Sequence, residues 1–189
     1  MKDKFDLRYF TDVLIADVVA SQKRLDAEDS PQNRRDIVRT AMSSVEGLIW
    51  FLKVRVFGLP RVEWKLTAHE YDALFERSYH VAANGVVRRT TRHLPTATTL
   101  KLVARIIRRQ FPEFTEDFSG EGWCRVLAAI EVRHRLTHPK SVEDLQVSDR
   151  DVQCAEYAFR WTLAFLLRAA AYGAMGELPE DPGGTGDSG

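Results

Sequence analysis

The sequence has few cysteines, no long uninterrupted apolar run and no excess of charge. Its only cysteines, Cys124 and Cys154, both lie in apolar periodic segments, where we expect them to be buried, and no secretory signal opens the chain. The most apolar stretch, residues 159–175, contains Arg160 and Arg168, whose insertion into a bilayer would be costly. These absences argue against a disulfide-stabilised secreted protein and against a membrane protein. They predict a reduced, cytoplasmic location.

The charges balance overall but not locally. Lys+Arg and Asp+Glu both number 27, so the net charge predicts no class of partner. Residues 84–112, however, contain no carboxylate. The cations of this segment are Arg88, Arg89, Arg92, Lys101, Arg105, Arg108 and Arg109. Such a segment favours binding of a polyanion, unless the acidic side chains of residues 113–121 fold back and neutralise it. Both readings stay open at this point.

Apolar residues recur at spacings of three and four in several stretches, which indicates amphipathic helices. Ser30, Ser119 and Ser148 each precede such a stretch and are predicted N-caps, and Asp151 completes a capping-box-like start after Ser148. The expected helices cover residues 7–27, 31–56, 67–84, 100–111, 119–137 and 148–174. The pattern predicts an all-α bundle of five or six helices in one domain, residues 1–175, followed by a disordered tail, residues 176–189.

The third expected helix is bounded by two short signals. Thr67 and Glu70 form a capping box at its start, and Asn84-Gly85 marks its end. Between residues 85 and 95 the helical periodicity fails. We therefore expect a loop there, including Val86-Val87.

The stretch from Arg133 to Lys140 contains the most chemistry. Pro139 disfavours helical backbone at His138, so the helix should end near Thr137. On an ideal helix Arg133 and His138 lie about 140° apart, whereas His134 and His138 lie only about 40° apart. A pairing of Arg133 with His138 therefore needs an unwound last turn or a second subunit related by a two-fold axis.

This octapeptide suits the binding and cleavage of RNA. A guanidinium can hold two phosphoryl oxygens, imidazoles exchange protons near neutral pH, and RNA carries its own nucleophile in the 2′-hydroxyl. Arg135 and Lys140 would add phosphate contacts. A zinc site resembling H-E-x-x-H would need a glutamate where Arg135 stands. The plainer alternatives are that Arg133 only interacts with the helix dipole and that His138 is an exposed turn residue.

These residues resemble a known family. Arg133, a polar His134 and four residues between Arg133 and His138 look like the R-x4-6-H motif of HEPN domains. Residues 123–140, an apolar helix running into the motif and then proline, are similar to the end of the HEPN catalytic helix. The preceding long helix, with Glu46 in its middle, resembles its neighbour in that family.

The resemblance implies a HEPN bundle that forms a homodimer with both motifs in one cleft. Many members are metal-independent endoribonucleases of toxin–antitoxin or antiviral defence systems, without a cofactor. Arg133 would then bind the scissile phosphate, His138 would transfer protons and His134 would help to orient them. Lys140 stands where members regulated by nucleotide transfer often carry tyrosine, so that mode of control is not expected here.

The resemblance leaves several roles open. Glu46 could orient the motif, or it could pair with Arg39 or Lys53, which we expect on a solvated helix face. A non-catalytic HEPN module that binds RNA or a nucleotide and regulates a partner is the alternative function. A plain helical dimerisation or adaptor domain is a third. The expected substrate-binding residues are Arg135, Lys140, Arg88, Arg89, Arg92, Lys101 and Arg105. An antitoxin or a defence partner protein would complete the system.

Overall fold

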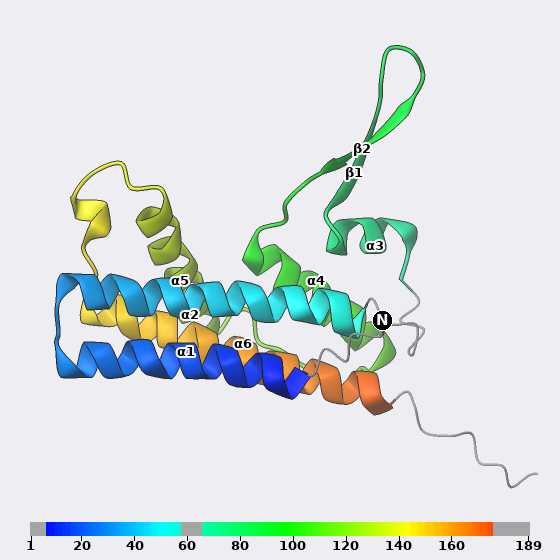
Figure 1. Ribbon diagram of the computed structural model, residues 1–189. Coiled ribbons are helices and arrows are strands. Elements are labelled where there is room, and N and C mark those ends of the chain that lie inside the picture. Colours follow the sequence, from blue (N-terminus) through cyan, green and yellow to red (C-terminus); the bar gives the residue numbers. More distant parts are fainter. Residues whose placement is uncertain (1–6, 58–65, 176–189) are drawn as a thin grey trace, which may run out of the picture.

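The computed structural model describes residues 7–57 and 66–175, which form a helical bundle with one small β-hairpin (Figure 1). The α-helices are α1 Leu7–Ala27, α2 Pro31–Phe51, α3 Ala68–Leu74, α4 Thr96–Gln110, α5 Glu121–Thr137 and α6 Asp149–Met175. The predicted all-α bundle is confirmed. No helix in the described part of the chain has the length and apolar character needed to cross a bilayer. The expected tail, residues 176–189, lies outside the described residues.

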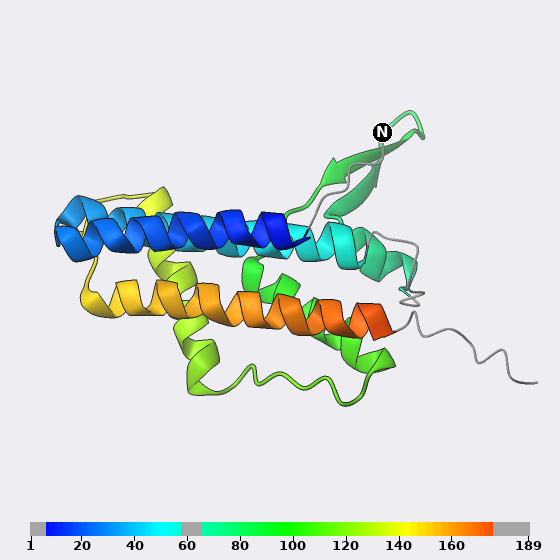
Figure 2. The same cartoon turned by 60° about the horizontal axis from the view of Figure 1, so that its bottom comes forward.

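Helix α2 is the central element that positions the rest. It begins as predicted, with Ser30 Oγ accepting a hydrogen bond from the Asn33 amide at 3.3 Å and Pro31 at the first helical position. It continues as a π-helical turn, Leu52–Val56. Helices α1, α5 and α6 all pack against α2, and α1, α2 and α6 run side by side in both views (Figures 1 and 2). The buried face of α2 comprises Ile37, Val38, Ala41, Met42, Ser44, Val45, Leu48, Ile49 and Phe51.

The third expected helix is much shorter than its pattern suggested. Helix α3 stops at Leu74, and the chain then forms an antiparallel hairpin of β1, Arg77–Val81, and β2, Val87–Thr91. The expected loop over residues 85–95, including Val86-Val87, is therefore wrong for residues 87–91, which form β2. Asn84-Gly85 lies in the hairpin turn, where Gly85 has φ +79°, and does not end a helix. Valine, threonine and tyrosine on both sides of Asn-Gly are also typical of a β-hairpin.

Tertiary contacts explain why the helix stops. The capping box of Thr67 and Glu70 forms as predicted, but Glu76 adopts a left-handed backbone conformation with φ +55°. The Glu76 carboxylate accepts hydrogen bonds from Lys53 Nζ at 2.8 Å and lies 2.6 Å from His93 Nδ1. The Glu76 carbonyl also accepts a hydrogen bond from the Arg92 amide at 2.9 Å. These bonds fix the base of the hairpin to the end of α2, so the expected solvated position of Lys53 is wrong.

We expect Glu76→Ala to lower the free energy of unfolding by about 2 kcal/mol, because Lys53, only 13% exposed, would lose its charged partner. Burial would raise the pKa of Glu76, but hydrogen bonds from Lys53 and His93 outweigh it and hold this pKa below its ordinary value. The stabilisation is therefore present above the pKa of the unfolded carboxyl group and is lost as the pH falls. The difference between wild type and variant should shrink in acid.

Urea unfolding at neutral and acidic pH measures this effect. Glu131→Ala removes an exposed carboxylate of α5 and serves as the matched control. If both variants unfold with the same free energy at neutral pH, the ion pair at the base of the hairpin does not contribute as argued.

Two local expectations around α5 are corrected and one at α6 is confirmed. The N-cap of α5 is Gly120, not Ser119, because the Asp117 carboxylate accepts the Ser119 and Gly120 amides at 2.7 and 3.0 Å. Cys124 is exposed, whereas Cys154 is buried as expected. Ser148 and Asp151 exchange the expected capping hydrogen bonds, and these lie at the start of α6.

Candidate functional site

Helix α5 places the Arg–His motif at the edge of the core. Its buried residues are Trp123, Val126, Ala129, Val132 and Leu136. Arg133 follows Val132 and therefore lies at the rim of this face. The helix ends at Thr137 as predicted, and the His138 amide donates to the His134 carbonyl at 3.0 Å before the chain turns away at Pro139.

Arg133 is held by the neighbouring helix. Its Nη2 lies 2.7 Å from Glu46 Oε1 on α2, and the two side chains are 35% and 43% exposed. Glu46 thus pairs with Arg133 of the motif. An ion pair exposed to this extent contributes little to stability. A phosphate group could therefore replace the carboxylate on Arg133 at low cost.

The two imidazoles of the motif lie next to each other, and neither takes part in that ion pair. The rings of His134 and His138 are 5.3 Å apart between centroids, with planes at 58°, and both residues are exposed. Among the described residues, no hydrogen bond or ion pair joins Arg133 to His138 in the same chain. One chain thus presents a pair of adjacent imidazoles, whereas the guanidinium of Arg133 is paired with Glu46.

Arg135 and Lys140 differ in what they contact. Arg135 donates to the Asp144 carbonyl at 2.7 Å and to the Gln146 carbonyl, and it pairs with Asp151 at 2.8 Å. It therefore fastens the loop after α5 to the start of α6. The Lys140 side chain is exposed, and its backbone amide donates to the Asp144 carboxylate at 2.8 Å. Of these two cations, Lys140 is the one whose side chain is exposed, two residues after His138.

Arg39 is exposed, as expected for a solvated helix face, and it also contacts the end of α5. Its Nη2 donates a long hydrogen bond, 3.5 Å, to the carbonyl of Leu136 in the last turn of α5. Arg39, Glu46 and Lys53 recur every seven residues along one flank of α2, and all three make polar contacts to other elements. That spacing was the available signal for Arg39.

The structure distributes the basic segment over two elements. Arg88 and Arg89 are on β2, with Arg92 just beyond it, whereas Lys101, Arg105 and Arg108 line one side of α4. On α4 the three cations border a pocket of about 280 Å³ with Phe114, Glu116 and Phe118. Lys101 Nζ lies 5.5 Å from the centre of the Trp123 ring.

The acidic stretch that follows does not neutralise these cations. Glu116 pairs with Arg168, and burial raises the pKa of its carboxyl group. Asp117 accepts backbone amides at the start of α5, and Glu121 pairs with Arg125.

Among the cations of residues 84–112, Arg109 does have a carboxylate partner. It pairs with Glu70 of α3 at 2.8 Å and holds the pKa of that carboxyl group below its ordinary value. Within residues 7–57 and 66–175, the other six cations of the segment have no ion pair.

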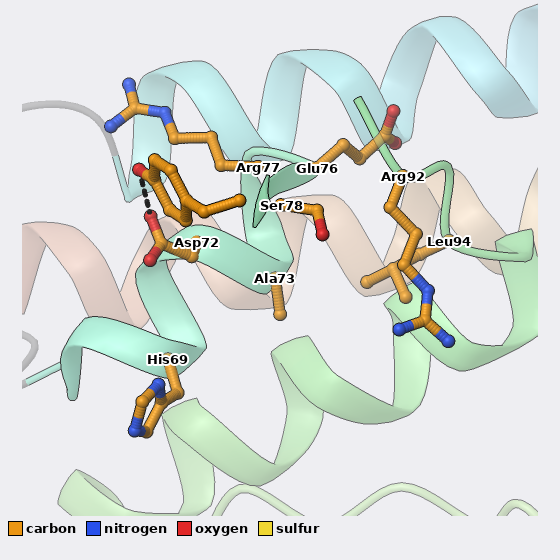
Figure 3. A pocket seen from close by; sticks show the side chains of 9 residues that line it. His69, Asp72, Ala73, Glu76, Arg77, Ser78, Arg92 and Leu94 are labelled. Carbon is orange, nitrogen blue, oxygen red and sulfur yellow. Dashed lines mark hydrogen bonds between the residues drawn. The ribbon is translucent and has the colours of Figure 1, made fainter. Parts of the chain in front are cut away.

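A second pocket, of about 340 Å³, lies at the base of the hairpin (Figure 3). His69 and Arg92 stand at its two sides, and the Tyr79 hydroxyl donates to the Asp72 carboxylate at 3.3 Å. The Glu76 carboxylate lies away from His69, in the contacts with Lys53 and His93 described above. Arg92 thus extends the basic surface of β2 to the root of the hairpin.

Comparisons with family models, with curated proteins and with solved structures found no match. In the part of the chain that the structure describes, no three His, Cys, Asp or Glu side chains gather in a way that could hold a metal ion.

Proposed function

We propose that this chain is a HEPN-type, metal-independent endoribonuclease that acts as a homodimer. The observation that carries the proposal is the division of the motif within one chain: His138 lies against His134, while Arg133 lies against Glu46. Two copies related by a two-fold axis would bring the guanidinium of one subunit to the imidazole pair of the other. Each composite site would then hold a phosphate between cation and imidazoles.

The proposed reaction is internal transesterification of RNA. His138 takes the proton of a 2′-hydroxyl, whose oxygen attacks the adjacent phosphorus and forms a 2′,3′-cyclic phosphate. The bond to the 5′-oxygen breaks, and this oxygen takes up a proton from His134. Arg133 of the other subunit binds the non-bridging oxygens, where negative charge develops. The products are one strand with a cyclic phosphate and one with a free 5′-hydroxyl.

Exposed apolar side chains near the motif support self-association. Leu127 is 39% exposed on α5, on the same side as His134 and His138 two and three turns later, and Trp50 is 50% exposed one turn beyond Glu46. A second copy covering α2 and α5 would bury both. Glu46 would position Arg133 in the free subunit, and Arg39 would add positive charge beside it.

The basic surfaces described above would bind the rest of the RNA. Arg88, Arg89 and Arg92 would act from the hairpin, Lys101 and Arg105 from α4, and Lys140 beside the imidazoles. In this proposal Arg135 supports the site by fastening the loop that carries Lys140. The activity fits a toxin or an antiviral defence effector, held in check by an antitoxin or a defence partner.

Incubation of the purified chain with RNA in excess chelator tests this function. We expect cleavage in chelator, because no step of the reaction requires a metal ion. The fragments should end in 2′,3′-cyclic phosphates, because the 2′-hydroxyl is the nucleophile. Mass spectrometry of the fragment ends distinguishes them from the 3′-hydroxyl ends of other nucleases. An intact RNA substrate after prolonged incubation, at micromolar protein where a dimer would form, would remove the proposal.

The alternative function is a non-catalytic HEPN module that binds RNA or a nucleotide and regulates a partner. The pocket beside α4 favours it, because three cations and two phenyl rings could hold a nucleotide without any use of the motif. Salt-dependent binding without turnover would support this alternative.

A further inference from the structure

The hairpin projects away from the helical bundle (Figures 1 and 2). Every residue of β2 is exposed, and β1 is exposed from Tyr79 onwards. A two-stranded ribbon without an apolar cover is only marginally stable in water. Its base is nevertheless fixed by Glu76, Lys53 and His93, so the hairpin projects from the bundle as an arm.

The charge of this arm has one sign. From Arg77 to Pro112 the sequence contains no Asp or Glu. Neighbouring residues of a strand point to opposite faces, so Arg88 and Arg89 lie on different faces. The register places His80 opposite Arg88 and Tyr79 opposite Arg89. Each face therefore carries a guanidinium next to a ring that can contact sugar or base.

Cations on both faces of a ribbon match two phosphate backbones, one on either side. A single strand of nucleic acid offers one backbone, whereas the groove of a duplex offers two, and a two-stranded ribbon fits inside a major groove. The deep groove of a regular A-form stem is too narrow for side chains to read. A ribbon would enter it near the end of the stem, where the groove opens beside a loop.

The distance between the hairpin and the Arg–His motif also suits one duplex stem. Arg39 contacts the last turn of α5, and Lys53 binds the base of the hairpin, fourteen residues further along one continuous helix. Fourteen helical residues span roughly 20 Å, which is less than one turn of a duplex. Figure 1 shows the end of α5 and the hairpin at opposite ends of α2, both rising from it.

We infer that the substrate is an RNA stem–loop, with the hairpin arm in the groove of the stem and the unpaired loop at the motif. This inference rests on the proposed function, because it assigns the class of RNA that the same site would cut. Unpaired nucleotides are required there, since in-line attack by the 2′-hydroxyl needs a backbone that can rotate. The arm selects the structure of the RNA and the motif acts on the strand beside it.

Binding by the full chain carrying His138→Ala, which is expected to cut RNA too slowly to alter the substrate during the measurement, tests the inference. Fluorescence anisotropy compares a labelled stem–loop RNA with an unstructured RNA of the same length, over a range of salt concentrations. The arm variant adds Arg88→Ala and Arg89→Ala. The matched control instead adds Lys23→Ala and Arg24→Ala, which removes two adjacent exposed cations of α1. Circular dichroism checks that all three chains remain folded.

We expect the parent chain to bind the stem–loop at least tenfold more tightly than the unstructured RNA. The arm variant should lose most of this preference, and the slope of log K against log salt for the stem–loop should fall by about two. The control should behave as the parent. The inference would be overturned if the arm variant and the control bound the stem–loop with equal affinity. It would also be overturned if the parent chain bound the stem–loop no more tightly than the unstructured RNA.

The two proposals fail in different ways. If the wild-type chain never cuts RNA but the arm variant alone loses stem–loop binding, the ribonuclease proposal fails and the arm still binds RNA. If the wild type cuts RNA and arm variant and control bind alike, only the role of the arm fails. A loss of self-association in the arm variant, measured by sedimentation and without a change in RNA affinity, would show that the arm pairs with a second copy instead.

Discussion

His138→Ala should reduce RNA cleavage by a factor of about 10² to 10⁴, the range expected when a general base is removed. The residue is exposed at the end of α5, and among the described residues its side chain forms no hydrogen bond or ion pair, so the variant should fold normally. Arg133→Ala should cost a similar factor, since a charged donor to the developing negative charge is lost. Initial rates on one RNA, in excess chelator and with matched melting temperatures, measure both effects.

Controls of the same residue type separate the motif from general changes in charge. His69→Ala removes another exposed histidine, and Arg125→Ala removes another arginine of α5, which pairs with Glu121. Both should retain cleavage within a few-fold of wild type. If His138→Ala and Arg133→Ala cut RNA as fast as these controls, any cleavage observed comes from other residues or from a contaminating nuclease.

Mixing the Arg133→Ala and His138→Ala variants should restore part of the RNA cleavage that each has lost. In a heterodimer of Arg133→Ala with His138→Ala, one composite site has lost both groups, whereas the other keeps Arg133 and the imidazole pair. A one-to-one mixture with free exchange is half heterodimer, so about one quarter of the wild-type sites would be intact. Cleavage should therefore rise from near zero to roughly that fraction.

The mixture distinguishes a shared site from a site within one chain. If Arg133 and His138 of the same chain acted together, neither subunit of the heterodimer would hold both groups, and mixing would restore nothing. Sedimentation of the mixture confirms that dimers form and exchange. Activity that stays at the level of the separate variants, despite exchange, would contradict a site built from two subunits.

The helical bundle could be predicted because its signals are local. The stripe of apolar residues on α2, the cap at Ser30 and the stop before Pro139 each depend on residues close in sequence. The Arg–His motif was likewise readable, because the helical rotation between Arg133, His134 and His138 follows from their spacing alone. The adjacent rings of His134 and His138 agree with that rotation.

The hairpin could not be read in the same way. The apolar residues after Thr67 fit helical spacing as far as Ala82, and Asn84-Gly85 can end a helix or turn a hairpin. The outcome was decided by Glu76, which takes a left-handed conformation while bound to Lys53 and His93. These partners come from before and after Glu76 in the chain, so no local window contains the contact.

By itself the sequence determined the long helices, the caps at Ser30, Thr67 and Ser148, and the presence of a guanidinium and two imidazoles at one helix end, because spacing and capping act within a few residues. Only the tertiary structure decided what each charge meets. Glu46 pairs with Arg133, and Arg135 binds the loop that follows α5. Arg88 and Arg89 lie on the projecting hairpin. The physical reason is that ion pairs form across packed elements, and their partners are fixed by how the helices pack rather than by their order in the chain.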